Sequence, residues 1–302
     1  MLVEIGVGLA AGSAALLASI ALRAPAAAPF PGYGWWGLGA MAGLEALLAL
    51  RTPGVTAFFT ALIWTAYIAA ADAAVFRLRG ESLLRQGRAF AAMALLSVPI
   101  WVIFEIYNLR LRNWDYVGVP GRFWLFALGA GWAFATILPG IFETADLLHC
   151  AWASRLRWRP WETSGWPWMA AGAACLVAPL LAPVRWAPLL FAPVWIGFAL
   201  LLEPVNRDRG WPSLLLELER GRPGRLLALL ASGAICGFFW EFWNYWAGAR
   251  WEYIFPILHR DRIFAMPAPG FLGFPPFALE CFALYVFLAH ALLPEEWRAR
   301  LW

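Results

Sequence analysis

Apolar residues along this chain are gathered into segments of about 20 residues, separated by short polar loops. A bilayer core of roughly 30 Å is crossed by about 20 apolar residues in α-helix, so each segment predicts a membrane-spanning helix. The pattern therefore predicts an all-α, polytopic transmembrane bundle of about nine spans. The predicted spans lie at 2–22, 33–50, 54–76, 89–109, within 122–153, 166–184, 186–205, 225–246 and 271–293.

Two of these segments have alternative interpretations. Residues 2–22 are longer than the roughly 7–15 apolar residues of a signal peptide, and the acidic Glu4 stands where a positive charge is expected, so they predict a span. The region 122–153 is interrupted by Pro139. It forms either one long helix kinked there, or a half-inserted segment followed by a span. A half-inserted segment would have to be shielded by protein, because backbone at membrane depth must satisfy its own hydrogen bonds.

The composition fits a chain whose solvent is lipid. Of the 302 residues, 62% are hydrophobic and 14% charged, and the mean hydropathy is +0.65. Soluble domains carry roughly 45–50% apolar and about 25% charged residues, so membrane lipids are the expected partners. No basic block indicates a nucleic acid, and the four Cys and three His lack the spacing of a metal or redox site, so we expect no metal or other cofactor. The oligomeric state has no signal in the sequence.

The arginines predict an orientation. With nine spans, the loops 23–32, 77–88, 154–165 and 206–225 share one side with the C-terminus and carry 15 of the 23 Arg. The positive-inside rule makes that side cytoplasmic. The prediction is an integral protein of a bacterial inner membrane, with the N-terminus outside and the C-terminus in the cytoplasm.

The second half of the chain repeats polar and aromatic residues of the first half in the same order. This predicts two parallel four-helix units, 33–153 and 166–293, with 1–32 as an extra N-terminal helix and linker and 294–302 as a cytoplasmic tail. The first set is Trp64, Asp72, Glu105, Asn108, Trp114-Asp115-Tyr116, Pro139 and Glu143; the second is Trp195, Glu203, Glu241, Asn244, Trp251-Glu252-Tyr253, Pro276 and Glu280.

An ionisable residue within a membrane span costs free energy to insert, so its presence there indicates a functional site. Glu and Asn stand at i and i+3 in each copy, on one helix face that should point to the bundle interior. A buried carboxyl group can act as a general acid, an Asn could orient it, and nearby aromatic rings can stabilise a cation. The predicted catalytic residues are Glu105, Asn108, Glu143, Asp146, Glu241, Asn244 and Glu280. The predicted binding residues are Tyr107, Trp114, Asp115, Tyr116, Trp240, Trp243, Trp251, Glu252 and Tyr253.

The same residues also have a structural interpretation. Glu–Asn pairs can fix helix register through hydrogen bonds worth about 0.6 kcal/mol each in bilayers. Trp114, Tyr116, Trp251 and Tyr253 can serve as anchors at the membrane surface.

The stretch from Glu105 to Glu143 resembles the membrane-embedded lycopene cyclase domain family. That family has a Trp-Asp-Asn-Tyr-like element followed by a Pro-x-Glu-Glu element, and Trp114-Asp115-Tyr116 and Pro139…Glu143 are similar in order. Here no Asn lies between Asp115 and Tyr116, and a single Glu stands four residues after the Pro. The resemblance implies acid-initiated cyclisation of a polyene, with Glu143 or Glu280 as the proton donor.

Three functions fit these observations. The first is an intramembrane enzyme acting by acid catalysis on an isoprenoid or other lipid, a cyclase or isomerase with an apolar small-molecule substrate. The second is a proton-coupled transporter of a small solute, and the third is a non-catalytic scaffold or assembly subunit. An enclosed apolar pocket, a polar path to one face, or a filled core would distinguish them.

Overall fold

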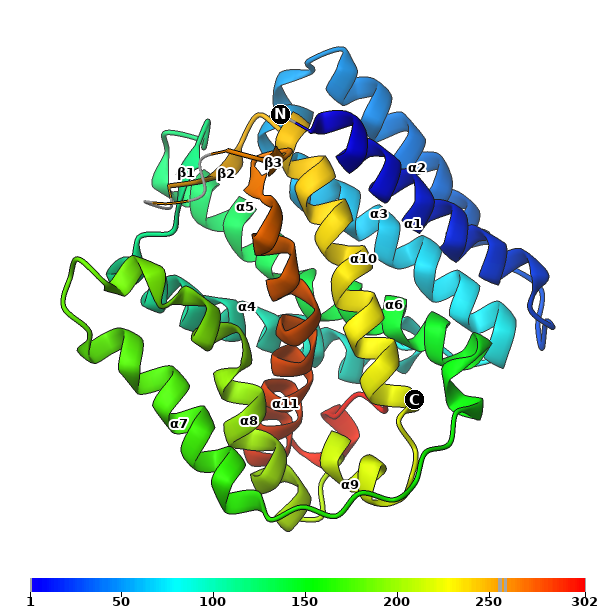
Figure 1. Ribbon diagram of the computed structural model, residues 1–302. Helices are drawn as coiled ribbons and strands as arrows, with labels where there is room; N and C mark the ends of the chain where they lie inside the picture. The colour runs from blue at the N-terminus through cyan, green and yellow to red at the C-terminus, as the bar shows by residue number, and fades with distance from the viewer. Residues whose placement is uncertain (1, 255–256, 258–259, 302) are drawn as a thin grey trace.

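The computed structural model describes residues 2–254, 257 and 260–301, and it is an all-α bundle with two very short sheets. The helices α10 and α11 run through the middle of the molecule, with α2 and α3 on one side and α7 and α8 on the other (Figure 1). The α-helices are α1 Val3–Arg23, α2 Gly32–Ala49, α3 Pro53–Arg79, α4 Arg88–Leu111, α5 Phe123–Ala135, α6 Ile137–Ala151, α7 Gly165–Leu181, α8 Phe191–Asp208, α9 Leu214–Glu219, α10 Gly224–Trp246 and α11 Phe274–Leu292. The strands are β1 Trp114–Val117, β2 Arg250–Tyr253, β3 Arg262–Ile263 and β4 Met266–Pro267.

Each predicted apolar segment contains a helix, and six of the helical segments described are long and apolar enough to cross a membrane. The other three predicted spans fall short for separate reasons. The helix α7 has only 17 residues, α2 begins with a run rich in Gly and Trp, and α8 ends in charged residues. The six are Val3–Arg23, Pro53–Arg79, Arg88–Leu111, Phe123–Ala151, Gly224–Trp246 and Ala268–Leu292. They support an integral membrane protein, and the count of nine stays a prediction.

The interrupted region 122–153 forms two helices that meet at Thr136, not at the proline. Pro139 has no N–H to bond to the carbonyl of Ala135, four residues earlier, so the break falls in the turn before it. Ser97 of α4 bridges the break: its hydroxyl donates to the carbonyl of Phe134 and accepts from the N–H of Leu138. The interruption is thus shielded by protein, as non-helical backbone at membrane depth must be.

The loops gather at two opposite ends, as an alternating topology predicts. At one end, the N–H of Gly248 bonds to the carbonyl of Thr56, and the N-terminus lies close to this region (Figure 1). At the other, the N–H of Trp158 bonds to the carbonyl of Gly221, next to the arginine-rich loops and the C-terminus. The latter is called the arginine-rich end below.

Helices from the two halves of the chain pack against each other. The helix α10 packs against α6 and α3 of the first half as well as against α11, and α4 packs against α11 of the second half as well as against α5 and α6. Aromatic pairs join the halves: Trp64 of α3 lies 5.0 Å from Trp240 of α10, and Phe104 of α4 lies 5.4 Å from Phe277 of α11, measured between ring centroids. Each half therefore depends on a helix from the other for its core.

Buried carboxylates hold the ends of α3 and α8 to the loops that follow. Asp72 accepts hydrogen bonds from Tyr33, Ser82 and the N–H of Leu84. In the second half, Glu203 accepts from the hydroxyl of Ser213 and the N–H of Leu214, in the same arrangement. These acids accept hydrogen bonds from N–H and O–H groups that would otherwise be buried without a partner, so their roles are structural.

Near the same end, Arg79 of α3 forms an ion pair of 2.7 Å with Asp146 of α6, whose side chain is fully buried. Arg79→Ala leaves that carboxylate without its cation, so we expect a loss of about 3–5 kcal/mol in the free energy of unfolding. Thermal unfolding in detergent measures the loss. Glu252→Ala is the control, because it removes one partner of the more exposed Arg250–Glu252 pair and should lose about 1 kcal/mol or less. Equal shifts in the two variants would contradict a special role for the buried pair.

Candidate functional site

The connections that follow α4 and α10 pair with each other as an antiparallel two-stranded sheet. In the register of β1 with β2, Trp114 lies opposite Tyr253 and Tyr116 lies opposite Trp251. Side chains two residues apart point to the same face of a strand, so these four aromatic side chains share one face of the sheet. The sequence did not predict this sheet.

The alternate residues of both strands lie on the other face. Asp115 and Glu252 are cross-strand neighbours there. Glu252 forms an ion pair of 2.7 Å with Arg250, and both side chains are partly exposed. These two predicted binding residues thus point away from the aromatic face.

An asparagine holds each strand to the helix before it. The Oδ1 of Asn108 accepts from the N–H groups of Asn113 and Trp114 at 2.8 and 3.2 Å, and its Nδ2 donates to the carbonyl of Trp114 at 2.8 Å. Asn244 makes the same two-way contact with Trp251, at 2.9 Å in each direction. The amide groups of both Asn therefore bond to strand backbone, and an orienting role toward the neighbouring Glu stays a prediction.

The glutamate one turn before each Asn is held by aromatic donors. The Oε1 of Glu105 accepts from the indole N–H groups of Trp101 and Trp114, at 2.7 and 3.2 Å, and from the hydroxyl of Tyr116 at 2.6 Å. The result is a carboxyl group bonded to side chains of both its own helix and β1.

The second half repeats this set of contacts. The Oε1 of Glu241 accepts from the hydroxyl of Tyr253 at 2.7 Å and the indole N–H of Trp251 at 3.3 Å. The same indole lies 3.0 Å from the hydroxyl of Tyr253. Glu241 is fully buried, and its Oε2 has no hydrogen-bond partner among the described residues. We call these two groups the Glu105 set (with Trp101, Trp114 and Tyr116) and the Glu241 set (with Trp251 and Tyr253).

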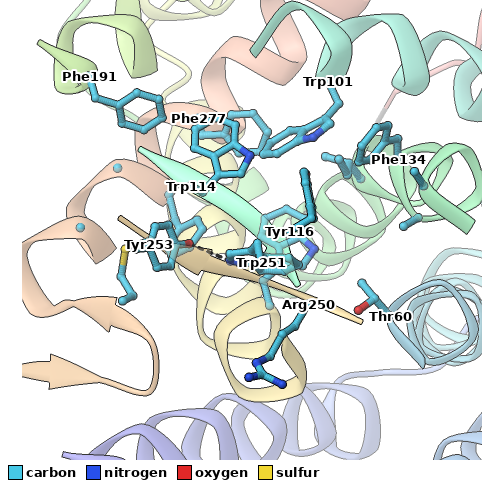
Figure 2. Close-up of a pocket in the computed structure, with 18 of the residues that line it drawn as sticks. Thr60, Trp101, Trp114, Tyr116, Phe134, Phe191, Arg250, Trp251, Tyr253 and Phe277 are labelled. Carbon is cyan, nitrogen blue, oxygen red and sulfur yellow. Dashed lines mark hydrogen bonds between the residues drawn. The ribbon is translucent and has the colours of Figure 1, made fainter. Parts of the chain in front are cut away.

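A cavity of about 620 Å³ lies against the aromatic face of the sheet (Figure 2). Both sets contribute to its wall, which is overwhelmingly apolar. Residues of α3 and α5 and large rings of α8, α10 and α11 form other parts of its wall. Its aromatic lining comprises Phe58, Trp101, Trp114, Tyr116, Phe126, Phe134, Phe191, Trp195, Trp240, Trp251, Tyr253, Phe274 and Phe277.

The predicted site residues divide into those that line this cavity and those that do not. The lining includes five of them, Trp114, Tyr116, Trp240, Trp251 and Tyr253. The carboxyl groups of the two sets lie directly behind the aromatic lining, since their hydrogen-bond donors form the cavity wall.

Other predicted residues make contacts elsewhere. The hydroxyl of Tyr107 donates to the carbonyl of Leu176 on α7, and the indole of Trp243 donates to Glu45 on α2. These contacts hold neighbouring helices together, which is the structural interpretation of such residues.

The acids of α6 and α11 lie apart from the cavity lining. The Oε1 of Glu280 accepts from the N–H of Phe198 on α8 at 2.8 Å, and Glu143 lies beside Asp72 on α3. Both side chains are fully buried. Glu143, Asp146 and Glu280 are therefore not among the lining residues of the cavity.

Several lining residues were missed in the sequence. Trp101 stands four residues before Glu105, a spacing that places both on one helix face and could have indicated their contact. Trp195 was noted only as part of the duplication. Phe277 and Arg250 carried no signal, because their roles depend on which helices and strands come together.

The two tyrosine hydroxyls at the cavity wall are hydrogen-bond donors. Burial, followed by the charge of the neighbouring glutamate, raises the pKa of Tyr116 and of Tyr253 well above the usual range. Because a raised pKa keeps the phenol protonated until a higher pH, both retain their protons throughout the physiological range.

The asparagine contacts give a testable prediction. Asn244→Ala leaves the buried N–H and carbonyl of Trp251 without their partner, at about 1–3 kcal/mol for each unpaired group. We expect a lower unfolding temperature and faster hydrogen exchange at residues 250–253. Gln86→Ala is the control, since Gln86 bonds Arg300 in an exposed contact at the arginine-rich end. Unchanged hydrogen exchange at residues 250–253 in the Asn244 variant would show that the contact of Asn244 with Trp251 does not hold β2 in place.

Comparison with known proteins found no match to any protein-family model, curated protein or solved structure. The contacts around the cavity, together with the resemblance of the Trp114 and Pro139 elements, are therefore the basis for inferring function.

Proposed function

We propose that this protein is an intramembrane enzyme that encloses a long apolar substrate, an isoprenoid or another lipid, and transforms it by acid catalysis. One observation carries the proposal: two Glu–Trp–Tyr sets, one from each half of the chain, meet at the wall of a single apolar cavity. The expected reaction is a cyclisation or isomerisation.

The character of the cavity supports an apolar substrate. Ligand pockets commonly measure about 300–1,000 Å³ and are lined mostly by hydrophobic and aromatic groups, and this one has about 620 Å³. Its walls include Trp101, Trp195 and Trp240 among others. The face of an aromatic ring attracts a cation by about 2 kcal/mol or more when desolvated, so these rings would stabilise a carbocation formed from the substrate.

A proton would reach the substrate through the tyrosines. Tyr116 and Tyr253 line the cavity, and each is bonded to a glutamate behind the wall. Glu105 and Glu241 are thus the proton reservoirs, and the phenol oxygens are the atoms that face the substrate. This assignment departs from the resemblance, which implies Glu143 or Glu280 as the donor.

Two sets at one cavity suit a reaction that takes up one proton and releases another. Protonation of a carbon–carbon double bond forms a C–H bond and leaves a carbocation. Attack by a second double bond closes a ring, or the cation moves along the chain. Loss of a proton to the second set restores a neutral alkene, so the reaction needs no oxidant or reductant.

The alternatives fit the cavity less well. A scaffold has no need of a cavity this large, and a proton-coupled carrier of a polar solute would need polar groups along its path. The cavity lining is apolar apart from Arg250, Thr60 and the aromatic N–H and O–H groups.

The same proposal extends to topology. We infer nine crossings, with the arginine-rich end in the bacterial cytoplasm, and an origin of the two halves by duplication. The matching contacts of Asn108 with Asn244, and of Asp72 with Glu203, support the duplication. Two four-helix units would then lie parallel, with α1 as the extra helix.

Lipid analysis of glutamate variants tests the catalytic assignment. Because each carboxyl group supplies or removes a proton, we expect Glu105→Gln and Glu241→Gln to reduce product formation by about 10²–10⁴-fold. The measurement is mass spectrometry of lipid extracts from cells expressing each variant, normalised to the amount of folded protein. Tyr116→Phe and Tyr253→Phe should also reduce product formation, as the variants of Glu105 and Glu241 do.

Glu143→Gln and Glu280→Gln are the matched controls, because these buried acids lie outside the cavity lining. A loss confined to them would contradict the assignment and favour the donor that the resemblance implies. Lipids unchanged in every variant would argue against an enzyme.

Occupancy of the cavity is tested separately with a photoreactive isoprenoid that carries a diazirine. We expect it to label residues around the cavity, such as Trp101 and Phe134, and to be displaced by its non-photoreactive parent. Ala133→Trp should greatly reduce labelling by filling the cavity. Ala127→Trp is the control, since Ala127 lies on the same helix but is exposed and outside the lining. Equal labelling in both variants would place the probe elsewhere.

A further inference from the structure

The cavity beside the paired strands, called the aromatic cavity below, has one aliphatic hydroxyl among its described lining residues, that of Thr60 on α3. A threonine inside a helix commonly donates its hydroxyl to the carbonyl four residues earlier. Thr65 and Thr144 do so, to Ala61 and Gly140, both at 2.7 Å. The side chain of Thr60 makes no hydrogen bond to any described residue. Its hydroxyl is therefore available to a ligand.

The backbone of α3 accounts for this difference. Phe58 has non-helical dihedral angles, with φ −117° and ψ 16°, so the helix is kinked just before Thr60. The carbonyl of Thr56, four residues before Thr60, accepts instead from the N–H groups of Gly248 and Ala249, at 3.1 and 3.3 Å. Phe58 and Thr60 both line the cavity. The kink thus leaves a hydroxyl without its usual acceptor at the wall of an apolar cavity.

The other side-chain donors of the wall are largely used within the protein. The phenols and indoles of the two glutamate sets bond to those glutamates. Arg250 gives its Nε and Nη2 to Glu252, at 3.1 and 2.7 Å. Trp195 and Trp240 differ: neither indole bonds to a described residue, and neither N–H is fully enclosed. Thr60 and these two indoles are therefore left for a ligand.

Thr60 lies toward the end of the bundle opposite the arginine-rich end. It is one turn of α3 from Thr56, whose carbonyl bonds to the loop after α10 at that end. Figure 2 shows Thr60 and Arg250 on one side of the pocket, away from Phe191 and Phe277. Because an unpaired polar group is costly in hydrocarbon, an amphiphile in a bilayer keeps its polar end toward the surface. Thr60 is placed to receive that end.

We infer that the substrate of the aromatic cavity carries a neutral oxygen group, a hydroxyl or a carbonyl, which forms a hydrogen bond with Thr60. This assignment rests on the proposed function and narrows its substrate class to an oxygenated isoprenoid or other lipid. A few polar groups in an apolar pocket commonly fix the orientation of a ligand. A site that bonds to an oxygen of its ligand also rejects the analogue without that oxygen, since its own polar group is then left unpaired. Thr60 thus selects the substrate and directs its chain toward the aromatic rings.

The test is competition for binding to the full chain purified in detergent. The probe is a hydrocarbon isoprenoid that carries a diazirine, so it has no oxygen of its own. The competitors are geranylgeraniol, its aldehyde geranylgeranial, and the hydrocarbon with the same carbon chain. The concentration that halves labelling of the cavity is measured for the wild type, Thr60→Val and Thr60→Ser. Thr65→Val is the matched control, because it removes a hydroxyl from the same helix outside the cavity lining.

In the wild type, we expect the alcohol or the aldehyde to displace the probe at about one tenth of the concentration that the hydrocarbon requires. The reason is that the hydrocarbon leaves the hydroxyl of Thr60 unpaired. Thr60→Val should abolish this preference, because valine keeps the shape of the side chain but has no hydroxyl. Thr60→Ser and Thr65→Val should retain it.

Equal displacement by all three competitors in the wild type would overturn the assignment of an oxygenated substrate, whether or not any variant folds. A preference that persists unchanged in Thr60→Val would overturn the role of Thr60. Competition for binding needs no turnover, so these outcomes are separate from the lipid analysis of the glutamate variants. Labelling of the wild type only outside the cavity would overturn this assignment together with the enclosed substrate of the proposed function.

Discussion

Wherever this chain leaves a helix near the hydrocarbon, its backbone N–H and C=O groups must find partners within the protein, and that constraint organises the rest of the structure. The strands after α4 and α10 meet it by pairing with each other and by binding Asn108 and Asn244. The break at Thr136 meets it through Ser97. Because the strand pairing joins the two halves, the same bonds that satisfy the backbone also bring both sets of aromatic residues to one cavity.

The helices were predictable because hydropathy alone requires them. A run of about 20 apolar residues has few alternatives to a helix in lipid, and the location of the loop arginines at one end follows from the alternation of spans. The duplication was visible as repeated residue identities. The matching contacts of Asn108 and Asn244 agree with it, although duplication itself stays a prediction.

What the sequence could not provide is the way in which the halves combine. The packing of α4 and α10 against helices of the other half, and the pairing of β1 with β2, depend on contacts between residues far apart in the chain. Glu105 and Glu241 could be selected as intramembrane acids, but their distinction from Glu143 and Glu280 could not. All four stand in apolar segments, and only the fold places aromatic donors and a cavity beside two of them.

The surroundings of the buried acids separate their roles. Asp72 and Glu203 accept backbone and hydroxyl hydrogen bonds at the ends of helices, and Asp146 is paired with Arg79, so each has a partner that explains its presence. Glu105 and Glu241 instead bond to weakly polar indoles and phenols. Such donors lack the full positive charge of a guanidinium, which suits the proposed role of these carboxyl groups in taking up and releasing a proton.

The lining of the aromatic cavity limits the kind of substrate that the proposed function can have. In the aromatic cavity, the one formally charged lining residue among those described is Arg250, and Glu252 already pairs with it. A substrate bearing a phosphate would have to compete with that pair or bury its charge in an apolar wall, which is expensive. The proposed function therefore requires a substrate that is uncharged along its length and that enters from the bilayer.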